Sequence, residues 1–203
     1  MFTQTLTEKV LRSPLVDLLT GPHGVDRYTE LVDPTWTTDA RARVVDVRRS
    51  TPPRSVTLLL DPNAAVTGYR AGQHLNLTVE IDGRRHTRCY SPASAEGSPP
   101  LIELTIGAHD GGLVSGHLYR HARPGMVVDL SEPAGDFVLP DERPPRRILF
   151  VSGGSGITPP VMSMLRTLQA EGFDGEIAFV HYARTPPAEA CYRAELAATG
   201  VRV

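Results

Sequence analysis

Hydrophobic and polar residues alternate along much of the middle of the chain, roughly from residue 41 to residue 133. Alternation with a period of two is typical of strands that bury one face. The stretches that show it are 41–49, 55–62, 73–91, 101–110 and 125–133. The third contains Asp82-Gly83, a favoured two-residue hairpin turn. This pattern predicts a small antiparallel β-barrel, with one helix over 112–122 inserted before the last strand.

The pattern changes after the proline-rich stretch 140–145. The apolar runs "ILFVSGG" (148–154) and "EIAFVHYA" (176–183) are short and continuous, which is typical of parallel strands buried on both faces. Helical periodicity follows each run, over 160–172 and 187–200. Strand, helix, strand, helix predicts a parallel α/β unit with right-handed crossovers. The closing "VRV" resembles the start of a third strand.

The first 36 residues have apolar residues at helical spacing, interrupted by Pro14 and by Gly21-Pro22. Two interpretations stay open: a helical cap packed on the main body, or an amphipathic surface for a membrane or a partner. We therefore expect a β plus α/β protein in three parts. A helical extension would occupy residues 1–37, a β-barrel domain 38–142 and an incomplete parallel α/β domain 146–203.

The composition of the chain excludes several classes of function. The 203 residues are 40% hydrophobic and carry a net charge of −2, so a core is expected and a general nucleic-acid binder is not. The two cysteines, Cys89 and Cys191, allow neither a disulfide framework nor an iron–sulfur cluster held by this chain alone. No apolar run approaches the roughly 20 residues of a membrane span, and no signal peptide is recognisable. We expect a cytoplasmic protein, and any association with a membrane is expected only through a partner.

Three stretches carry candidate chemistry. In "RCYS" (88–91), Arg88 and Tyr90 share one face of a strand, and the Ser91 hydroxyl lies beside them. A positive charge that can bind a phosphate is thus next to an aromatic ring that can stack on a flat ligand. "GGLVSGHL" (111–118) places two glycines and a serine at a helix start, and "SGGSGITPP" (152–160) places glycines between a strand and a helix. Both suit an anionic group, because helix amino-terminal N–H groups are unpaired.

Each stretch has an ordinary structural explanation when it is taken alone: a strand with an exposed Arg and a half-buried Tyr, a loop with a Ser near a helix start, or a tight turn. Their order along the chain is more specific. Together with "PAGDF" (133–137) and "HYART" (181–185), it resembles the ferredoxin–NADP(+) reductase-like flavoprotein family. The amino-terminal "VDPTW" (32–36) is similar to the reductases that serve bacterial fatty-acyl desaturases and oxygenases.

The resemblance implies that the barrel binds FAD, with FMN less expected, and that the second domain binds NADPH or NADH. Tyr90 would stack on the flavin, Ser91 would lie near its reactive N5 atom, and Thr158 would lie close to the nicotinamide, so Ser91 and Thr158 are the expected catalytic residues. The implied cofactor-binding residues are Arg88, Cys89, Tyr90, Ser91, Gly112, Leu113, Val114, Ser115, Gly153, Gly154, Gly156, Thr158 and Arg184.

The implied activity is hydride transfer from NAD(P)H to FAD, followed by single-electron transfer to an iron–sulfur protein or domain that serves an oxygenase or a desaturase, including a membrane-bound desaturase. Arg184 favours NADPH, since an arginine suits a 2′-phosphate. The arginines within 41–54 and 84–88 form an arginine-rich set, which is either a solvated surface or a docking face for an acidic partner. We expect no metal site, although His117 and His121 have zinc-like spacing; they are expected on the phosphate side of the flavin or facing solvent.

Three features depart from the family pattern. Pro160 adds a residue before Ser163, so the helix register there is open. Cys89 is expected to pack in the barrel, not to act in redox chemistry. A nucleotide domain of this family has about five parallel strands, whereas this sequence supplies two and a fragment, so we expect a truncated domain. The alternative function is therefore a flavin-binding module, or a fragment, without turnover.

Overall fold

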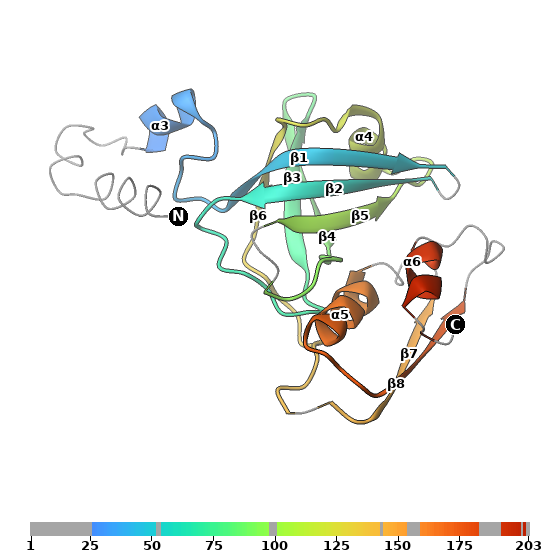
Figure 1. Cartoon of the computed structure of the whole chain (residues 1–203). Helices are drawn as coiled ribbons and strands as arrows, with labels where there is room; N and C mark the ends of the chain where they lie inside the picture. The colour runs from blue at the N-terminus through green and yellow to red at the C-terminus, as the bar shows by residue number, and fades with distance from the viewer. Residues whose placement is uncertain are drawn as a thin grey trace, which may run out of the picture.

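The computed structural model of the protein describes residues 26–51, 54–97, 101–142, 144–153, 159–182, 192–199 and 201. These residues form two sheets with helices packed between and beside them (Figure 1). The strands are β1 Arg41–Ser50, β2 Ser55–Pro62, β3 Leu75–Ile81, β4 Arg84–Tyr90, β5 Ile102–Gly107, β6 Val127–Leu130, β7 Arg147–Gly153 and β8 Glu176–Tyr182. The helices are α3 Asp26–Val32, α4 Leu113–His121, α5 Pro159–Ala170 and α6 Arg193–Ala198.

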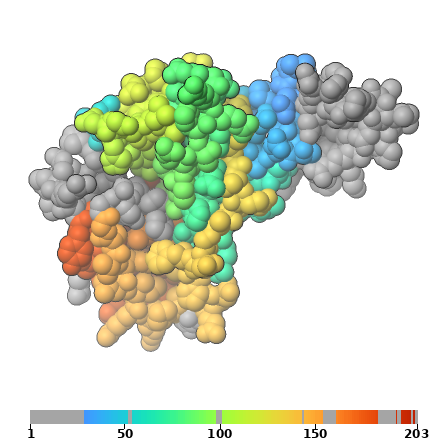
Figure 2. Space-filling view, turned by 180° about the vertical axis from the view of Figure 1, so that it is seen from behind, coloured from blue at the N-terminus to red at the C-terminus, as the bar shows by residue number. Residues whose placement is uncertain are grey.

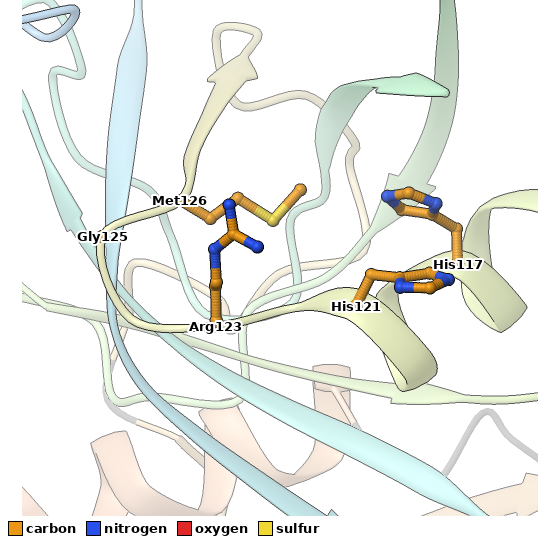
Figure 3. Close-up of a pocket in the computed structure, with 5 residues that line it drawn as sticks. All are labelled: His117, His121, Arg123, Gly125 and Met126. Atoms are coloured by element: carbon orange, nitrogen blue, oxygen red, sulfur yellow. The ribbon is translucent and has the colours of Figure 1, made fainter. Parts of the chain in front are cut away.

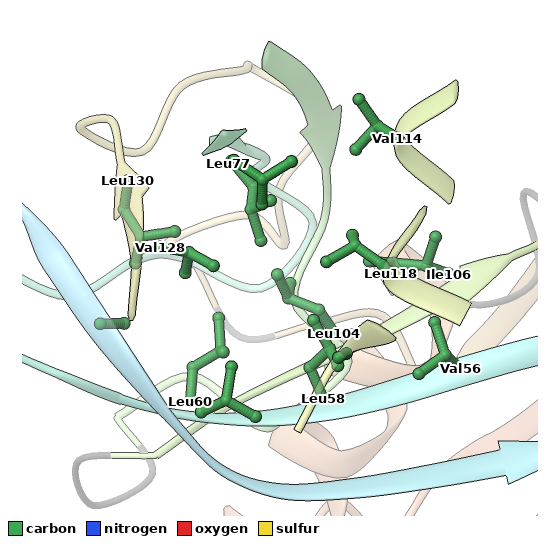
Figure 4. Packing of buried hydrophobic residues seen from close by; sticks show 14 of the residues in the cluster. Val56, Leu58, Leu60, Leu77, Leu104, Ile106, Val114, Leu118, Val128 and Leu130 are labelled. Carbon is green, nitrogen blue, oxygen red and sulfur yellow. The ribbon is translucent and has the colours of Figure 1, made fainter. Parts of the chain in front are cut away.

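The first sheet has six strands in the order β4-β3-β6-β1-β2-β5, and every neighbouring pair is antiparallel. Its curvature encloses a core of aliphatic side chains, which Figure 4 shows converging from the strands and from α4. The alternation in the sequence is the reason: in β3, every second residue from Leu75 to Ile81 is buried. Val114 and Leu118 of α4 complete this core. The predicted strands and the inserted helix are confirmed.

The hairpin between β3 and β4 turns at Asp82-Gly83, as the sequence predicts. Both residues have positive φ, 51° and 72°. Such a turn matches the right-handed twist of the two strands, and it fixes their register from Leu75 opposite Tyr90 to Ile81 opposite Arg84. The register matters for function, because it decides which residues of β4 face the inside of the sheet.

The second sheet pairs β7 and β8 in parallel, as expected for consecutive strands joined by a helix. Phe150 and Phe179 point to the side covered by α5, where they join Met162, Leu165 and other buried residues in a second core. In Figure 1, α5 and α6 lie between this sheet and the six-stranded sheet, and Figure 2 shows the later elements (orange) packed directly beneath the earlier strands.

One expectation about this sheet is wrong. The apolar runs predicted strands buried on both faces, but Leu149 and Val151 are 62% and 61% exposed. On β8, Val180 and Tyr182 are also exposed. The described helices cover one face of the two-stranded sheet, so alternate residues of each strand remain open on the other face. Of the closing "VRV", only Val201 is described, and it packs against the second core without forming a strand.

Before β1, helix α3 and the loop that follows it are held on the six-stranded sheet by polar contacts. The Asn63 side-chain amide donates to the carbonyls of Thr35, Thr37 and Asp39 at 2.8–3.3 Å. Asp33 accepts a charged hydrogen bond of 2.6 Å from Arg43. These contacts favour the interpretation of a packed cap for residues 26–39. The helical periodicity predicted before residue 26 lies outside the described residues.

Candidate functional site

The edge strand β4 presents Arg88 and Tyr90 on the inner side of the six-stranded sheet. Directly opposite residues of an antiparallel pair share a face, and Arg88 and Tyr90 lie opposite Leu77 and Leu75, which are fully buried in the core. Arg88 is nevertheless exposed, and Tyr90 is only half-buried against the core. The inner face of the sheet is therefore left open at this edge, beside an aromatic ring and a guanidinium group.

The electrostatics of this edge suit a flat anionic ligand. Burial raises the pKa of the Tyr90 hydroxyl, and the nearby Arg88 charge only partly opposes that shift, so the ring stays neutral at physiological pH. The Arg88 guanidinium donates to its neighbour, the Thr87 carbonyl, at 2.7 Å. Its remaining N–H groups can donate to a phosphate.

Cys89 lies on the opposite face of β4, across from Asn76. The expectation that it packs in the barrel is wrong, because its side chain is exposed and its thiol is free. Partial desolvation raises the pKa of that thiol, so it is not an activated nucleophile. If Cys89 takes part in cofactor binding, its backbone is the part within reach of the inner face.

The amino-terminal end of α4 is the second feature of the site. Gly111 has φ of +80°, and Gly112 is the helix N-cap with no side-chain hydrogen bond to the first turn. The first turn, which includes Leu113, Val114 and Ser115, carries no acidic residue. Its N–H groups and the Ser115 hydroxyl can therefore receive an anion. Val114 is buried in the core and fixes the helix there.

Close packing explains why residue 112 is a glycine. A Cβ atom at this position would lie 2.4 Å from the Ser115 Oγ and 3.2 Å from the His109 carbonyl oxygen. Helix α4 also contacts both β2 and β4, so the glycine turn belongs to the same part of the molecule as the Arg88 strand. The structure thus brings the first two sequence motifs onto neighbouring elements.

The third motif is only partly described. Gly153 ends β7 opposite Tyr182 and is exposed. Gly154, Gly156, Thr158 and Arg184 lie outside the described residues. Helix α5 begins at Pro159, as expected for prolines in a first helical turn, and this places Ser163 in its second turn. Ser91 directly follows β4 and is half-buried.

A hollow of about 330 Å³ lies at the other end of α4 (Figure 3). It is lined by His117, His121, Arg123, Gly125 and Met126. The two imidazole rings are 4.9 Å apart. Burial and the neighbouring charges of His121 and Arg120 lower the pKa of His117. The hollow lies at the carboxyl-terminal end of the helix, whereas an anion is favoured at the amino-terminal end. The histidines are thus not at the phosphate-binding turn.

Sequence reasoning missed a polar cluster between the two sheets, centred on Arg166 of α5 and Glu103 of β5. Arg166 Nη1 donates to Glu103 Oε1 at 2.9 Å, and Tyr192 Oη donates to the same oxygen at 2.8 Å. Glu195 and Arg48 complete the cluster. No local motif reports these contacts, since the hydrogen-bonded pairs of this cluster lie 29 to 89 positions apart in the sequence. One signal was available: polar residues at 163, 166 and 167 within an otherwise apolar helix.

Among the residues that the structure describes, no group of three or more His, Cys, Asp and Glu side chains is close enough to hold a metal ion. Among the helices in this part of the chain, none is long and apolar enough to cross a membrane.

Residues 45–139 match the family described as the oxidoreductase FAD-binding domain. A curated "NADPH oxidoreductase" of Mycobacterium tuberculosis is 40% identical over 185 residues, which are 89% of this chain and 48% of that protein. The glycine betaine monooxygenase reductase subunit of Pseudomonas aeruginosa is 37% identical over 118 residues, 58% of this chain and 32% of that protein. The chain thus spans about half or less of the length of these relatives.

Among solved structures, the flavohaem-like FAD/NAD binding domain of nitric oxide dioxygenase from Vibrio cholerae has a TM-score of 0.69. It is 24% identical, and the likeness covers 79% of this chain and 69% of that one. Fold and site together define a flavin-binding oxidoreductase architecture. The chain has the fold of the ferredoxin–NADP(+) reductase-like flavoproteins, and residues 45–139 match the oxidoreductase FAD-binding domain. This confirms the resemblance, the fold class and the expected flavin.

Proposed function

We propose that the protein takes hydride from NAD(P)H onto FAD and passes single electrons to an iron–sulfur protein or domain that serves an oxygenase or a desaturase. One observation carries the proposal: Arg88 and Tyr90 stand on the core-facing side of an edge strand, yet Arg88 is exposed and Tyr90 is only half-buried. A structural role alone would bury this face or make it wholly polar. An inner face left open beside an uncapped helix end fits a planar cofactor with a phosphate tail.

The described residues have separate roles in this proposal. Tyr90 would stack on the flavin ring, and its neutral hydroxyl would add no charge there. Arg88 would neutralise a phosphate, while the first-turn N–H groups of α4, from Leu113 to Ser115, would donate to the same anionic group. Ser91, which follows β4, would offer its hydroxyl to the ring. FAD, when bound, accepts a hydride and releases electrons one at a time.

The nicotinamide would be bound by the glycine-rich motif between β7 and α5, with Gly153, Gly154, Gly156 and Thr158, and by Arg184, which follows β8 in the sequence. The 40% sequence identity to a protein named "NADPH oxidoreductase" supports NADPH over NADH as the hydride donor. The corresponding division of the chain is an extension over 1–37, an FAD-binding domain over 38–142 and a nucleotide-binding domain over 146–203. The exposed free thiol of Cys89 fits a cytoplasmic location.

For the acceptor, the glycine betaine monooxygenase reductase subunit supports an oxygenase system. The arginine-rich set gives little support for docking an acidic partner. Its members are largely neutralised within the chain: Arg41 and Arg85 contact Asp129, Arg43 contacts Asp33, Arg48 contacts Glu103 and Arg54 contacts Asp110.

A flavin titration followed by anaerobic reduction tests the proposal. Purified protein should bind FAD with quenching of its fluorescence, and NADPH should bleach the bound flavin much faster than free flavin. Arg88→Gln and Tyr90→Leu should each weaken FAD binding, by roughly 10-fold or more for a charged phosphate contact or a lost stacking plane. Arg85→Gln is the matched control, because Arg85 lies on the outer face of the same strand and pairs with Asp129 at 2.7 Å.

The outcomes separate the competing functions. Binding without bleaching would leave a flavin-binding module without turnover. A folded protein that binds no FAD at high concentration would remove the proposal altogether.

A further inference from the structure

The two sheets are joined through a polar face on α5. Ser163, Arg166 and Thr167 lie three and four positions apart, so they share one face of the helix. Ser163 and Thr167 are buried. Ser163 Oγ donates to the Ser94 carbonyl at 2.7 Å, and the Glu96 N–H donates to Thr167 Oγ1 at 2.8 Å. The helix thus hydrogen-bonds to residues 94–96, shortly after Tyr90 and Ser91 in the sequence.

Arg166 is the centre of this junction. Its Nε and Nη2 donate to the two carboxylate oxygens of Glu195 at 2.7 and 2.8 Å, a bidentate pair that ties α5 to α6. Its Nη1 donates to the Ala93 carbonyl at 2.8 Å and to Glu103 at 2.9 Å, both of which belong to the part of the chain around the six-stranded sheet. One planar guanidinium therefore fixes the mutual orientation of four segments, which a lysine could not do.

Glu103 receives donors from both sides of the junction. Oε2 accepts from Arg48 of β1 at 2.6 Å, and Oε1 accepts from Arg166 and from Tyr192. Because a carboxylate can only accept, the Tyr192 proton points to Glu103, and Tyr192 must accept from Thr105 at 2.5 Å. In every side-chain hydrogen bond to the Glu103 carboxylate, Glu103 is thus the acceptor and Arg48, Arg166 or Tyr192 is the donor.

The cluster is neutral overall and well satisfied. Burial alone would raise the pKa of Glu103, but the bonds and charge of Arg166, with Tyr192 and Arg48, lower it below its usual value. Tyr192 has φ of +62°, a strained value for a tyrosine, at the start of α6. Buried charge clusters are weak contributors to net stability but define one geometry sharply, and backbone strain persists where surrounding contacts require it.

We propose that Arg166, through Glu103, Glu195 and Tyr192, is a positioning residue that sets the nicotinamide side of the site against the flavin side. The proposal rests on the function proposed above. Helix α5 begins directly after the glycine-rich motif in the sequence, and the segment that it contacts begins at Ser94, three residues after Ser91. Holding α5 on that segment holds the two rings at contact distance. Hydride transfer requires such contact, and a displacement of about 1 Å can cost about 100-fold in rate.

Stopped-flow reduction of the FAD-loaded protein tests this. Arg166→Gln should lower the limiting rate of flavin reduction at saturating NADPH by roughly 10- to 100-fold. Tyr192→Phe, which removes one oxygen and keeps the ring, should lower it by less. The affinity for FAD and the rate of reduction by dithionite, which needs no nicotinamide, should stay unchanged. The matched control is Arg147→Gln, which removes an arginine from an exposed pair with Glu176 that lies within the two-stranded sheet alone.

A purely structural role predicts a different result: a lower melting temperature with limiting rates close to wild type in both variants, which would overturn the proposal. If the wild-type protein is not reduced by NADPH, the proposed function fails, and a distance measurement decides the inference separately. Spin labels at Ala64→Cys and Glu171→Cys, both exposed positions, are introduced with Cys89→Ser and Cys191→Ser. Their distance distribution should be narrow with Arg166 present and broad in Arg166→Gln. Equal widths would overturn the proposal.

Discussion

At the scale of single residues, Gly112 shows how closely packed the turn before α4 is, the turn that we propose to bind the phosphate of FAD. Gly112→Ala would place a Cβ atom 2.4 Å from the Ser115 Oγ, so the hydroxyl must leave its position. We expect the affinity for FAD to fall by about 10-fold, the equivalent of one displaced charge-assisted hydrogen bond. Fluorescence titration measures it.

Gly116→Ala is the matched control within the same helix. A Cβ atom there meets only the flexible end of Arg120, at 3.2 Å. Replacing an interior helical glycine by alanine should leave the FAD affinity unchanged and stabilise the protein by about 0.5–1 kcal/mol. An equal loss of affinity in both variants would show that the turn is insensitive to its local packing.

The sequence predicts residues of this kind well when a short local pattern specifies them. Arg88 and Tyr90 were expected on one face because a strand alternates, and the register confirms it. Arg166, Glu103 and Tyr192 were not foreseen, because their meeting depends on how two sheets dock. Cys89 was misplaced for a simpler reason. An edge strand has solvent on its outer face, and the sequence does not say which strand is at the edge.

At the scale of elements, two turn glycines allow backbone strain to be separated from close packing. Gly83 has φ of +72° with open space around its Cβ position, whereas Gly72 has φ of +103° and a Cβ there would lie 2.0 Å from the Phe137 carbonyl oxygen. Gly83→Ala should destabilise the hairpin by about 1 kcal/mol from conformation alone. Gly72→Ala should cost about 3 kcal/mol, since overpacking adds to the strain.

Urea unfolding monitored by circular dichroism measures both variants. The Gly72 site also abuts Met164 of α5, at 2.5 Å from the same Cβ position, so this loop is a further contact between the two sheets. Similar losses of stability in the two variants would contradict the close approach seen at Gly72.

Strand boundaries followed the sequence to within a few residues, whereas α6 is described only over Arg193–Ala198 of the helix predicted over 187–200. The surroundings of the elements were predicted less well. The apolar runs of β7 and β8 predicted parallel strands correctly and burial incorrectly, since Val151 remains open. A continuous apolar run indicates that both faces of a strand can be buried. It does not report whether another layer is present to cover it. That depends on elements elsewhere, so periodicity within the run cannot supply it.

At the scale of the whole molecule, the junction between the sheets should depend on pH. Glu103 ionises more readily in the folded protein than at its ordinary value of 4.5, because Arg166, Tyr192 and Arg48 outweigh the effect of burial. A lowered carboxyl pKa means that the unfolded chain binds more protons in this range. The contribution of Glu103 is therefore complete above its ordinary pKa and is lost as the pH falls through its lower value in the folded state.

Glu103→Gln should thus destabilise the protein at pH 7 by about 1–3 kcal/mol, the usual range for removing one partner of buried hydrogen bonds. The difference from wild type should shrink as the pH falls below about 4.5, the ordinary pKa of this carboxyl group. Urea unfolding at a series of pH values measures it. Asp110→Asn is the control, since Asp110 pairs with Arg54 on the surface and is 99% exposed. A stability difference for Glu103→Gln that stays constant down to acidic pH would mean that the charge of Glu103 does not hold the two sheets together.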